Sequence, residues 1–354
     1  MVVSVVLTAA MLGGLLASGA AVSIAEFSRR IAHAGHSGFS PLSVAIYVAI
    51  LAALQESFAF PIAFYQGLLL DRRYGLSVEP PGAWLRDHAK AMALGLCLSL
   101  AAAETVYFSL RVAPLWWWLI SAAAFVAAMV LIAKLAPVVL LPLFYKFTPL
   151  DRDSLRTRLV SISERAGVPV LGVYEWGLGG KTRRANAALV GTGATRRIIV
   201  SDTLLAEYSD DEIEVILAHE IGHHVHRDIL VALVAEAALL GAGFYAAARA
   251  LEAWWQRLGF QGPADIAALP LLLLAGGAVT MAATPLANAL SRWNERRADR
   301  YALTLTRQPG AFISAMKRLG TQNLAEEQPS RTVLWLFHSH PPIEQRIKAA
   351  RGFL

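Results

Sequence analysis

Long apolar stretches alternate with shorter polar ones along the whole chain. Six of the apolar stretches approach or exceed the ~20 residues that a helix needs to cross the hydrocarbon core of a bilayer. The fourth contains Lys134 and Pro137, so we expect that helix to kink or to leave the membrane there. The pattern predicts a mainly α-helical, multi-pass membrane protein. The six segments are roughly 2–25, 41–70, 91–110, 115–143, 229–250 and 266–290.

The first apolar segment has two interpretations. A cleaved signal peptide needs a positively charged start, but this chain begins with MVVSVV, and its ASGAA stretch is not a clear cleavage site. We therefore expect a retained membrane helix.

The basic residues favour one orientation of the chain. With six spans, both termini lie on one side, together with loop 71–90, the polar segment 146–228 and the tail from 291. This side is the richer in arginine and lysine, so the positive-inside rule places it in the cytoplasm. The opposite loops carry fewer basic residues, which are Arg29, Arg30, Arg111, Arg249 and Arg257.

The composition agrees with a membrane protein and excludes several other classes. Hydrophobic residues make up 56% of the chain and charged residues only 16%, whereas a soluble domain is nearer one quarter charged. The net charge is +6, but the chain has no clustered basic tract that indicates nucleic acid. With Cys97 as its single cysteine, the chain cannot form an internal disulfide or a cysteine-based zinc site.

The polar segment 146–228 reads as a small α/β insert. Residues 151–167 have helical spacing and end at a glycine. Short β-rich runs follow at 168–176 and 196–202, and 185–191 is a possible third strand between them. A last helix begins after Ser209, which suits an N-cap because acids follow in the first turn. We expect this helix to continue to the next apolar segment.

That last helix contains the pattern H-E-x-x-H, formed by His219, Glu220 and His223. Residues four apart share a helix face, so the two imidazoles can bind one Zn²⁺ while the glutamate acts as general base. The alternative is a solvated, charged helix end outside the bilayer, because the pattern fixes only three letters. His224 and His226 follow directly. His226 returns to nearly the same helix face as His219 and could compete as a ligand or touch substrate, but we expect both residues to be solvated or to support the site from outside.

A third ligand is expected, because catalytic zinc usually has three protein ligands and one open position. The chain leaves the histidine helix near Ile229 and re-emerges two membrane segments later near Leu290. At 1.5 Å per residue, His223 lies ~9 Å before the apolar boundary and Glu295 ~7 Å after it, at a matching depth. Glu295 is therefore the expected ligand, and Asp299, one turn on, could hold a ligand imidazole. The alternative for Glu295 is a surface acid among arginines.

Three further acids lie within apolar segments. Ionisable groups there often mark a polar cavity or pathway. The other interpretation is that each lies near an interface or pairs with a neighbour, and the sequence leaves both open. These acids are Glu56, Glu104 and Glu236.

Several spaced motifs together resemble one known group of enzymes. They are DRRYGLS with WLRDHAKA, APVVLLPLFYKFTPL, RANAALVG, RRIIVSDTLL, HEIGH, SRWNERRAD and HSHPPIEQRI. In this order they resemble the integral-membrane zinc metalloproteases of the type I CAAX prenyl protease (sterile-24) group, which are related to the HtpX-like proteases. At 354 residues, with a basic KTRRA stretch before Asn186, the chain is similar to a shorter, bacterial-type member.

The resemblance implies a role for each matching residue. It implies that His219, His223 and Glu295 bind one zinc ion, and that Glu220 is the catalytic base and acid. Asn186 and Ala187 would lie on an edge strand, to which an extended substrate peptide can add by main-chain hydrogen bonds. His340 would face the cleft and either stabilise the oxyanion or bind substrate. Asp299 and Arg346 would support the ligands.

These patterns predict a zincin-like metalloprotease domain at the membrane face of a helical membrane protein. We expect membrane helices over 1–145 and a protease domain over 146–354 that includes a membrane hairpin at about 229–290. The expected substrates are membrane-associated or hydrophobic peptides, cleaved in CAAX-type processing or in membrane protein quality control. The bacterial inner membrane is the expected location, with the site facing the cytoplasm.

Two rival functions remain open at this point. A transporter or metal-handling protein would explain the intramembrane acids and the histidines, but it would leave Asn186, Glu295 and the HSHPP stretch unexplained. An inactive scaffold is disfavoured by the intact Glu220. The sequence does not define the substrate or the oligomeric state, and the expected ligands would also accept cobalt or manganese.

Overall fold

The structure, a computed structural model, describes residues 2–33, 40–191, 193–324 and 329–353. The chain forms two compact units, each assembled from separate stretches of sequence. The helical unit consists of the chain up to Leu70, Pro81–Val130 and Ala235–Ala282. The sheet unit consists of Asp71–Pro80, Leu131–Val234 and the chain from Ala283 onward. Three long helices, α6 (Trp117–Leu135), α10 (Asp228–Trp254) and α11 (Leu269–Thr306), contribute residues to both units.

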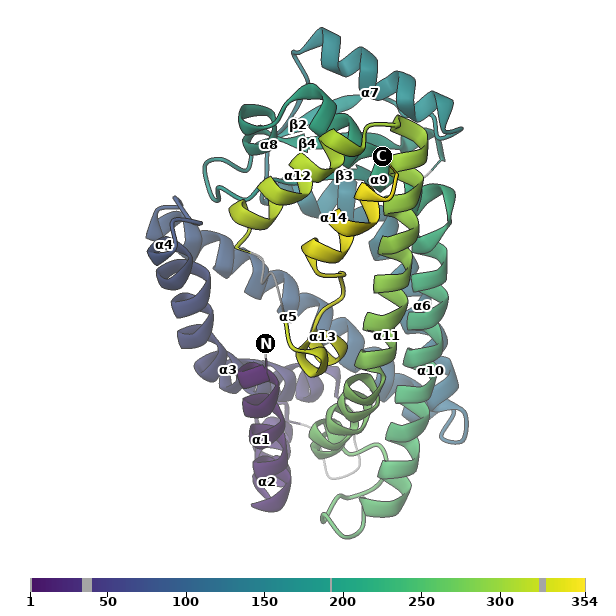
Figure 1. The fold of residues 1–354 in the computed structure, drawn as a ribbon. Coiled ribbons are helices and arrows are strands. Elements are labelled where there is room, and N and C mark those ends of the chain that lie inside the picture. The colour runs from purple at the N-terminus through teal and green to yellow at the C-terminus, as the bar shows by residue number, and fades with distance from the viewer. Residues whose placement is uncertain (1, 34–39, 192, 325–328, 354) are drawn as a thin grey trace. The chain divides into compact units, whose positions relative to one another are not determined.

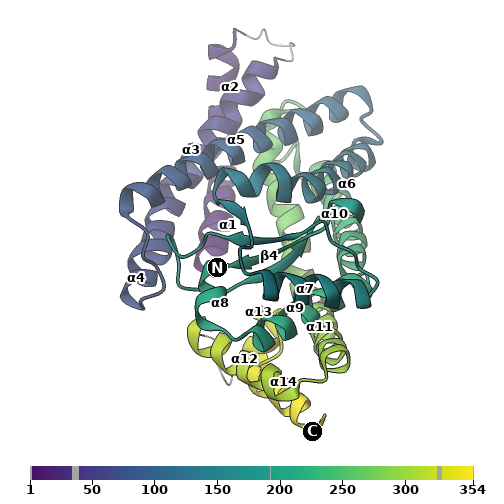
Figure 2. The same cartoon turned by 90° about the horizontal axis from the view of Figure 1, so that it is seen from above.

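The helical unit is built from long apolar helices. Its third helix contacts the first two (Figure 2). Tyr47 and Tyr107 are fully buried in its core, and the Tyr107 hydroxyl donates to the carbonyl of Ile266 over 3.1 Å. The elements are α1 (Val2–Ala17), α2 (Ala20–Ile31), α3 (Pro41–Phe64), π-helix η1 (Tyr65–Leu70), α5 (Pro81–Val112), α6 (Trp117–Leu135), α10 (Asp228–Trp254), 3₁₀-helix η5 (Ile266–Ala268) and α11 (Leu269–Thr306).

Five helices in the described part of the chain are long and apolar enough to cross a membrane. This confirms the mainly helical, polytopic class. Near Pro137, where a kink or an exit from the membrane was expected, α6 ends at Leu135 and a π-helical turn follows at Ala136–Leu140. The spans are Pro41–Arg73, Pro81–Val112, Trp117–Leu143, Asp228–Trp254 and Ile266–Thr306.

The apolar segment 2–25, expected to be a membrane helix, forms two helices in the structure. Helices α1 and α2 meet at a bend of 78°. Gly19 lies at the bend with φ of 74°, in the left-handed region that glycine enters without steric cost. The apolar composition continues through the bend, which is why the hydrophobic pattern did not reveal it. Only if this bent pair counts as one span does the total in the described residues reach six.

The sheet unit contains a four-stranded sheet in the order β1-β2-β4-β3. Strands β2 (Val173–Trp176), β3 (Ala187–Val190) and β4 (Arg197–Ser201) confirm the three β-rich runs. Strand β1 (Phe147–Pro149) was not predicted; it is three residues long and pairs antiparallel with β2. Strand β3 pairs antiparallel with β4, and its other side is an edge of the sheet.

Helices of the sheet unit gather around this sheet (Figure 1). Their apolar faces share one core with the strands, in which Leu159 of α7, Ile198 of β4, Leu217 of α9 and Phe312 of α12 are fully buried. The elements are α4 (Asp71–Arg73), η2 (Ala136–Leu140), η3 (Leu141–Leu143), α7 (Asp153–Arg165), η4 (Gly193–Thr195), α8 (Asp202–Glu207), α9 (Asp210–Val225), α12 (Pro309–Gln322), α13 (Arg331–Phe337) and α14 (Ile343–Arg351).

Helix α9 has the predicted beginning but an unpredicted end. Ser209 caps it, and Glu212 reaches back to the Ser209 backbone to complete a capping box. The expectation that the helix runs on without a break is wrong. It ends at Val225, Arg227 takes a left-handed conformation with φ of 59°, and α10 begins at Asp228. The chain therefore turns sharply just after the histidine pattern.

Candidate metal centre

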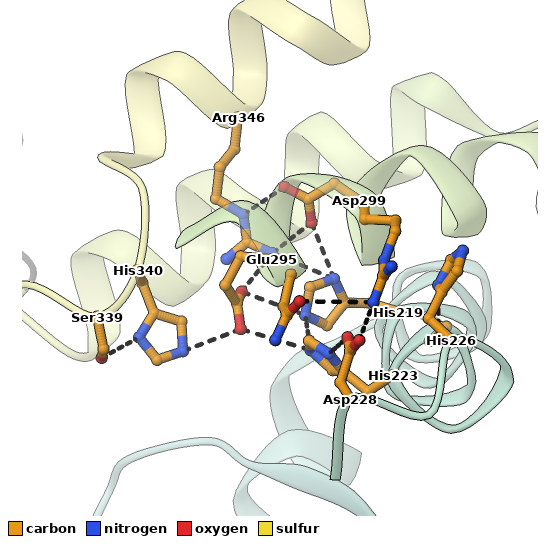
Figure 3. Close-up of polar contacts among 12 residues, drawn as sticks. His219, His223, His226, Asp228, Glu295, Asp299, Ser339, His340 and Arg346 are labelled. Atoms are coloured by element: carbon orange, nitrogen blue, oxygen red, sulfur yellow. Dashed lines mark hydrogen bonds and ion pairs between the residues drawn. The ribbon is translucent and has the colours of Figure 1, made fainter. Parts of the chain in front are cut away.

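His219, His223 and Glu295 meet at one point in the sheet unit (Figure 3). The Nε2 atoms of the two histidines are 3.2 Å apart. Each of them lies 3.4 Å from a different carboxylate oxygen of Glu295. The histidines come from successive turns of α9 and the glutamate from α11. The structure thus brings together the three residues that were expected to share a metal ion.

A glycine allows the two helices to approach this closely. A Cβ atom on Gly222 would lie 3.1 Å from the Cα of Ala298 and 3.3 Å from the Cβ of Tyr301. Gly222 lies between the two histidines in α9, and Ala298 lies one turn beyond Glu295 in α11. A side chain here would push apart the helices that carry the three groups.

Both imidazoles present the nitrogen that a metal ion needs. His219 Nδ1 lies 2.9 Å from Asp299, and His223 Nδ1 lies 2.8 Å from Asp228, so each Nδ1–H donates to a carboxylate. Both Nε2 atoms are then left as acceptors that face one another and Glu295. The Oε2 of Glu295 is buried, and its nearest charged neighbours are His219 Nε2 at 3.4 Å and a terminal nitrogen of Arg346 at 3.8 Å. Facing lone pairs and a buried carboxylate oxygen suit a bound divalent cation.

The same carboxylates make the two histidines basic when no metal is present. Burial lowers the pKa of His219, but hydrogen bonds to Asp299 and Glu295 outweigh it and raise that pKa to about 9. For His223, burial again lowers the pKa, and the bonds to Glu295 and Asp228 raise it overall. Protons therefore compete with a metal ion for the two Nε2 atoms near neutral pH.

Glu220 lies between the histidines in sequence and is partly buried. Burial raises the pKa of its carboxyl, although the neighbouring His219 and His223 oppose this shift. A raised pKa brings a carboxylate closer to neutral pH, where it can both accept and release a proton.

Arg346 supports the His219 side of the centre. It comes from α14 and holds both oxygens of Asp299, with Nε 2.8 Å from Oδ2 and a terminal nitrogen 2.6 Å from Oδ1. This two-pronged contact is the strongest geometry for a carboxylate and an arginine. The other Asp299 contact is to His219, so the carboxylate is fixed from two directions. Asp299 and Arg346 therefore lie together behind one histidine.

His340 lies at the open side of the centre (Figure 3). Its Nε2 is 3.3 Å from Oε1 of Glu295, and its side chain is 63% exposed. Arg292, one turn before Glu295 in α11, donates to the carbonyls of Leu334 and His338 over 3.0 and 2.5 Å. These bonds fix α13 and the turn that leads to His340. The prolines of HSHPP precede α14, with Pro342 at its N-cap.

The edge strand β3 belongs to the same unit. Ala187 is its first residue, and the exposed Asn186 immediately precedes it. The backbone N–H of Asn186 donates to Ser201 over 2.9 Å, which fixes the start of the strand to β4. His224 of α9 lies 2.9 Å from the carbonyl of Leu189 and so ties this strand to the helix that carries the metal centre.

Two residues at the centre were not assigned from the sequence. Asp228 holds His223, and Arg297 pairs with Asp228. Asp228 lies five residues after His223 and Arg297 two residues after Glu295, so proximity to the predicted ligands was the one available signal. His226 does not join the three residues expected to bind the metal. Its Nδ1 instead lies 2.8 Å from the Gly222 carbonyl.

The acids in the apolar segments differ from one another. Glu56 of α3 lies 2.6 Å from His88 of α5, which agrees with pairing to a neighbour. Glu236 of α10 lines a cavity of about 550 Å³ within the helical unit, together with Gln55 and Thr8. None of the three acids contributes to the metal centre.

Helices of membrane-spanning length, joined to a unit in which an H-E-x-x-H helix faces a glutamate, define an integral-membrane metalloprotease. The family model described as peptidase family M48 matches residues 149–354, and the model described as CAAX prenyl protease N-terminal, five membrane helices, matches residues 1–146. The chain belongs to peptidase family M48.

Individual relatives agree with this family. The chain is 29% identical to the uncharacterized metalloprotease YhfN of Bacillus subtilis, over 86% of this chain and 72% of that protein. It is 30% identical to a protease HtpX homolog of Methanopyrus kandleri, over 59% of this chain and 70% of that protein. Its fold is similar to the crystal structure of S. mikatae Ste24p, with a TM-score of 0.84, 20% identity and coverage of 93% of this chain and 80% of that one.

These findings confirm the class predicted from the sequence. The chain is a multi-pass membrane metalloprotease related to CAAX prenyl proteases and HtpX proteases. The transporter interpretation has no support among these relatives.

Proposed function

We propose that this protein is a zinc-dependent endopeptidase that cleaves membrane-associated or hydrophobic peptides. His219, His223 and Glu295 hold the zinc ion, and Glu220 is the general base and acid. The observation that carries the proposal is the meeting of two Nε2 atoms and one buried carboxylate within 4.8 Å of one another. Two imidazoles and one carboxylate form a known ligand set of catalytic zinc in metalloproteases.

The chain supplies the proton transfers of peptide hydrolysis. Zinc in such a site acts as a Lewis acid and allows water to serve as a nucleophile near neutral pH. Glu220 accepts a proton from the attacking water and passes it to the leaving amine. Burial raises the pKa of Glu220, which suits both steps. His340, at the open side of Glu295, donates to the carbonyl oxygen or to another part of the substrate.

The substrate binds as an added strand. Strand β3 has a free edge, and Asn186 and Ala187 lie at its start. An extended peptide that pairs with this edge gains main-chain hydrogen bonds that do not depend on its side chains. His224 links β3 to α9 and so keeps this edge in register with the zinc ligands. Asp299 and Arg346 keep the His219 imidazole in place.

The protein acts in the bacterial inner membrane, with its site on the cytoplasmic side. The distribution of basic loop residues supports this orientation. Membrane helices over 1–145 precede a protease domain over 146–354, which includes the hairpin of α10 and α11. The relatives include CAAX prenyl protease 1 of Saccharomyces cerevisiae and an HtpX homolog. CAAX-type processing and membrane protein quality control are therefore the two biological roles to compare.

The test compares purified wild type with Glu220→Gln. Both proteins are assayed for bound zinc and for cleavage of an unstructured, membrane-associated peptide. We expect zinc in both and a loss of cleavage of about 10²–10⁴-fold in the variant, because general acid–base catalysis contributes that much. Glu214→Gln is the matched control, since Glu214 lies on the same helix but pairs with Arg158, away from the centre.

The outcomes separate the parts of the proposal. Zinc in both proteins with cleavage only in wild type and the control supports it. Zinc-loaded wild type that cleaves neither a CAAX-type nor an unprenylated hydrophobic peptide contradicts the substrate class. Wild type that binds no zinc contradicts the ligand assignment.

A further inference from the structure

His223 has its own carboxylate and arginine, separate from those that hold His219. Asp228 is buried, and its Oδ2 lies 2.8 Å from Nδ1 of His223. Its other oxygen, Oδ1, accepts a hydrogen bond from Arg297. Both carboxylate oxygens are therefore engaged by side chains, and Asp228 does more than begin helix α10.

The backbone is bent to place Asp228 there. In an unbroken helix the residue five positions after His223 would lie ~7.5 Å further along the axis, out of reach of the imidazole. Here Arg227 takes φ of 59°, which is uncommon for a residue other than glycine, and the chain folds back toward His223. Such backbone strain gathers at functional sites, where it is held by the surrounding structure.

Arg297 is itself held in position. Its guanidinium lies 4.2 Å from the ring centre of Trp293, one turn earlier in α11. A terminal nitrogen also lies 3.4 Å from the side-chain oxygen of Asn294. Trp293, Asn294 and Arg297 belong to the same helix as Glu295. The arginine that neutralises Asp228 is therefore fixed relative to the carboxylate at the metal centre.

The arrangement mirrors the one behind the other imidazole. Asp299 accepts from Nδ1 of His219 and is held by Arg346. In both cases an aspartate sets which nitrogen carries the hydrogen, and an arginine cancels the aspartate's charge. If the two aspartates are balanced by the two arginines, Glu295 and Glu220 remain as the negative groups that face a divalent cation.

We propose that Asp228 and Arg297 are a positioning pair for His223. Asp228 fixes the imidazole with its Nε2 lone pair toward Glu295, and Arg297 holds the buried carboxylate in place. This inference rests on the proposed zinc site. Asp228 is the first residue of α10 and Arg297 lies in α11, so the pair also ties a zinc ligand to both helices of the membrane hairpin.

The test measures zinc affinity of the full-length protein in detergent by competition with a chelator. We expect Asp228→Asn to weaken zinc binding by about 10–100-fold, the usual effect of removing such a partner of a ligating histidine. An amide can offer either its oxygen or its NH₂, so it no longer fixes which nitrogen of His223 carries the hydrogen. Arg297→Gln is expected to change the affinity in the same direction, and Asp228→Glu to recover part of the loss.

The control is Glu214→Gln, in the helix α9 that carries His223; it breaks an ion pair to Arg158 of α7, away from the imidazoles. The thermal unfolding of each metal-free variant is measured alongside its zinc affinity. Arg297→Lys replaces Arg297→Gln if the latter does not fold. Weak zinc binding by Asp228→Asn, with wild-type affinity in the control, supports the inference.

Wild-type affinity in Asp228→Asn overturns the positioning role while leaving the proposed protease intact. An equal loss in the Glu214→Gln control also overturns it, because the effect would then be a general consequence of breaking an ion pair. If Glu295→Gln binds zinc as tightly as wild type, the proposed zinc site itself fails, and this inference with it.

Discussion

At the scale of single residues, the metal centre depends on which protons its two histidines hold. In the metal-free protein the pKa of His219 is raised to about 9 because Asp299 and Glu295 outweigh burial. A raised histidine pKa stabilises the metal-free fold fully below its unfolded pKa, and this contribution is lost as the pH rises through about 9. Metal binding has the opposite dependence, because it needs the neutral imidazole.

We therefore predict that zinc affinity rises with pH. Between pH 7 and pH 9 the apparent affinity should increase by about tenfold per unit for each proton displaced. Chelator competition at several pH values measures this, with buffers matched for their own zinc binding. Affinity that is constant over this range would contradict the protonated His219 of the metal-free protein.

The sequence predicted the three central ligands for a physical reason. The helical repeat alone places His219 and His223 on one face, and the similar distances of His223 and Glu295 from the apolar boundary, ~9 Å and ~7 Å along a helix, predicted a similar depth. Asp228 could not be found in this way. Its position depends on the left-handed backbone at Arg227, and an arginine gives no sequence signal for that conformation.

At the scale of elements, the centre depends on how closely α9 and α11 approach. A Cβ atom on Gly222 would meet backbone atoms of Ala298 at 3.1 and 3.3 Å. We predict that Gly222→Ala separates the helices, weakens zinc binding and destabilises the protein by about 1–3 kcal/mol, as overpacking does.

The matched control for this prediction is Gly241→Ala in α10, where an added Cβ would meet no atom within 4 Å. Zinc content and thermal unfolding are measured for both variants. A loss that is equal in the two variants would mean that the close approach at Gly222 has no special role.

The beginning of α9 gives a second prediction at this scale. Ser209 accepts from the backbone N–H of Glu212, and Glu212 returns a bond to the Ser209 backbone. Ser209→Ala should lower the free energy of unfolding by about 1 kcal/mol, since it leaves an N–H of the first turn without its partner. Ser209→Thr keeps the cap and should stay near wild type. Denaturant unfolding of the two variants checks this, and equal stabilities would contradict the capping role.

Elements that the sequence did not predict share a physical cause. Strand β1 is only three residues long, too short for a two-residue alternation to show. The bend between α1 and α2 lies within a continuous apolar stretch. Hydropathy depends only on composition and does not indicate the direction of a helix axis. Breaks that depend on one backbone conformation, at Gly19 and Arg227, leave the hydrophobic pattern unchanged.

At the scale of the whole molecule, the orientation in the membrane can be tested with single cysteines. Cys97 is the only cysteine in the chain, so Cys97→Ser provides a cysteine-free background. In that background, Arg183→Cys should react with a membrane-impermeant maleimide only after the cells are permeabilised. Leu115→Cys lies in the loop between α5 and α6. It should react in intact cells, because the membrane span of α5 separates this loop from the cytoplasmic loop 71–90. The reverse pattern would contradict the cytoplasmic orientation.

The central claim, that His219, His223 and Glu295 together hold zinc, is tested most directly by X-ray absorption at the zinc edge. In zinc-loaded wild type the account predicts two imidazole nitrogens and one or two oxygens at about 2.0–2.2 Å and no sulfur. In Glu295→Gln it predicts a lost oxygen ligand or lost zinc. A sulfur ligand, a single imidazole, or the same spectrum in both proteins would contradict the account.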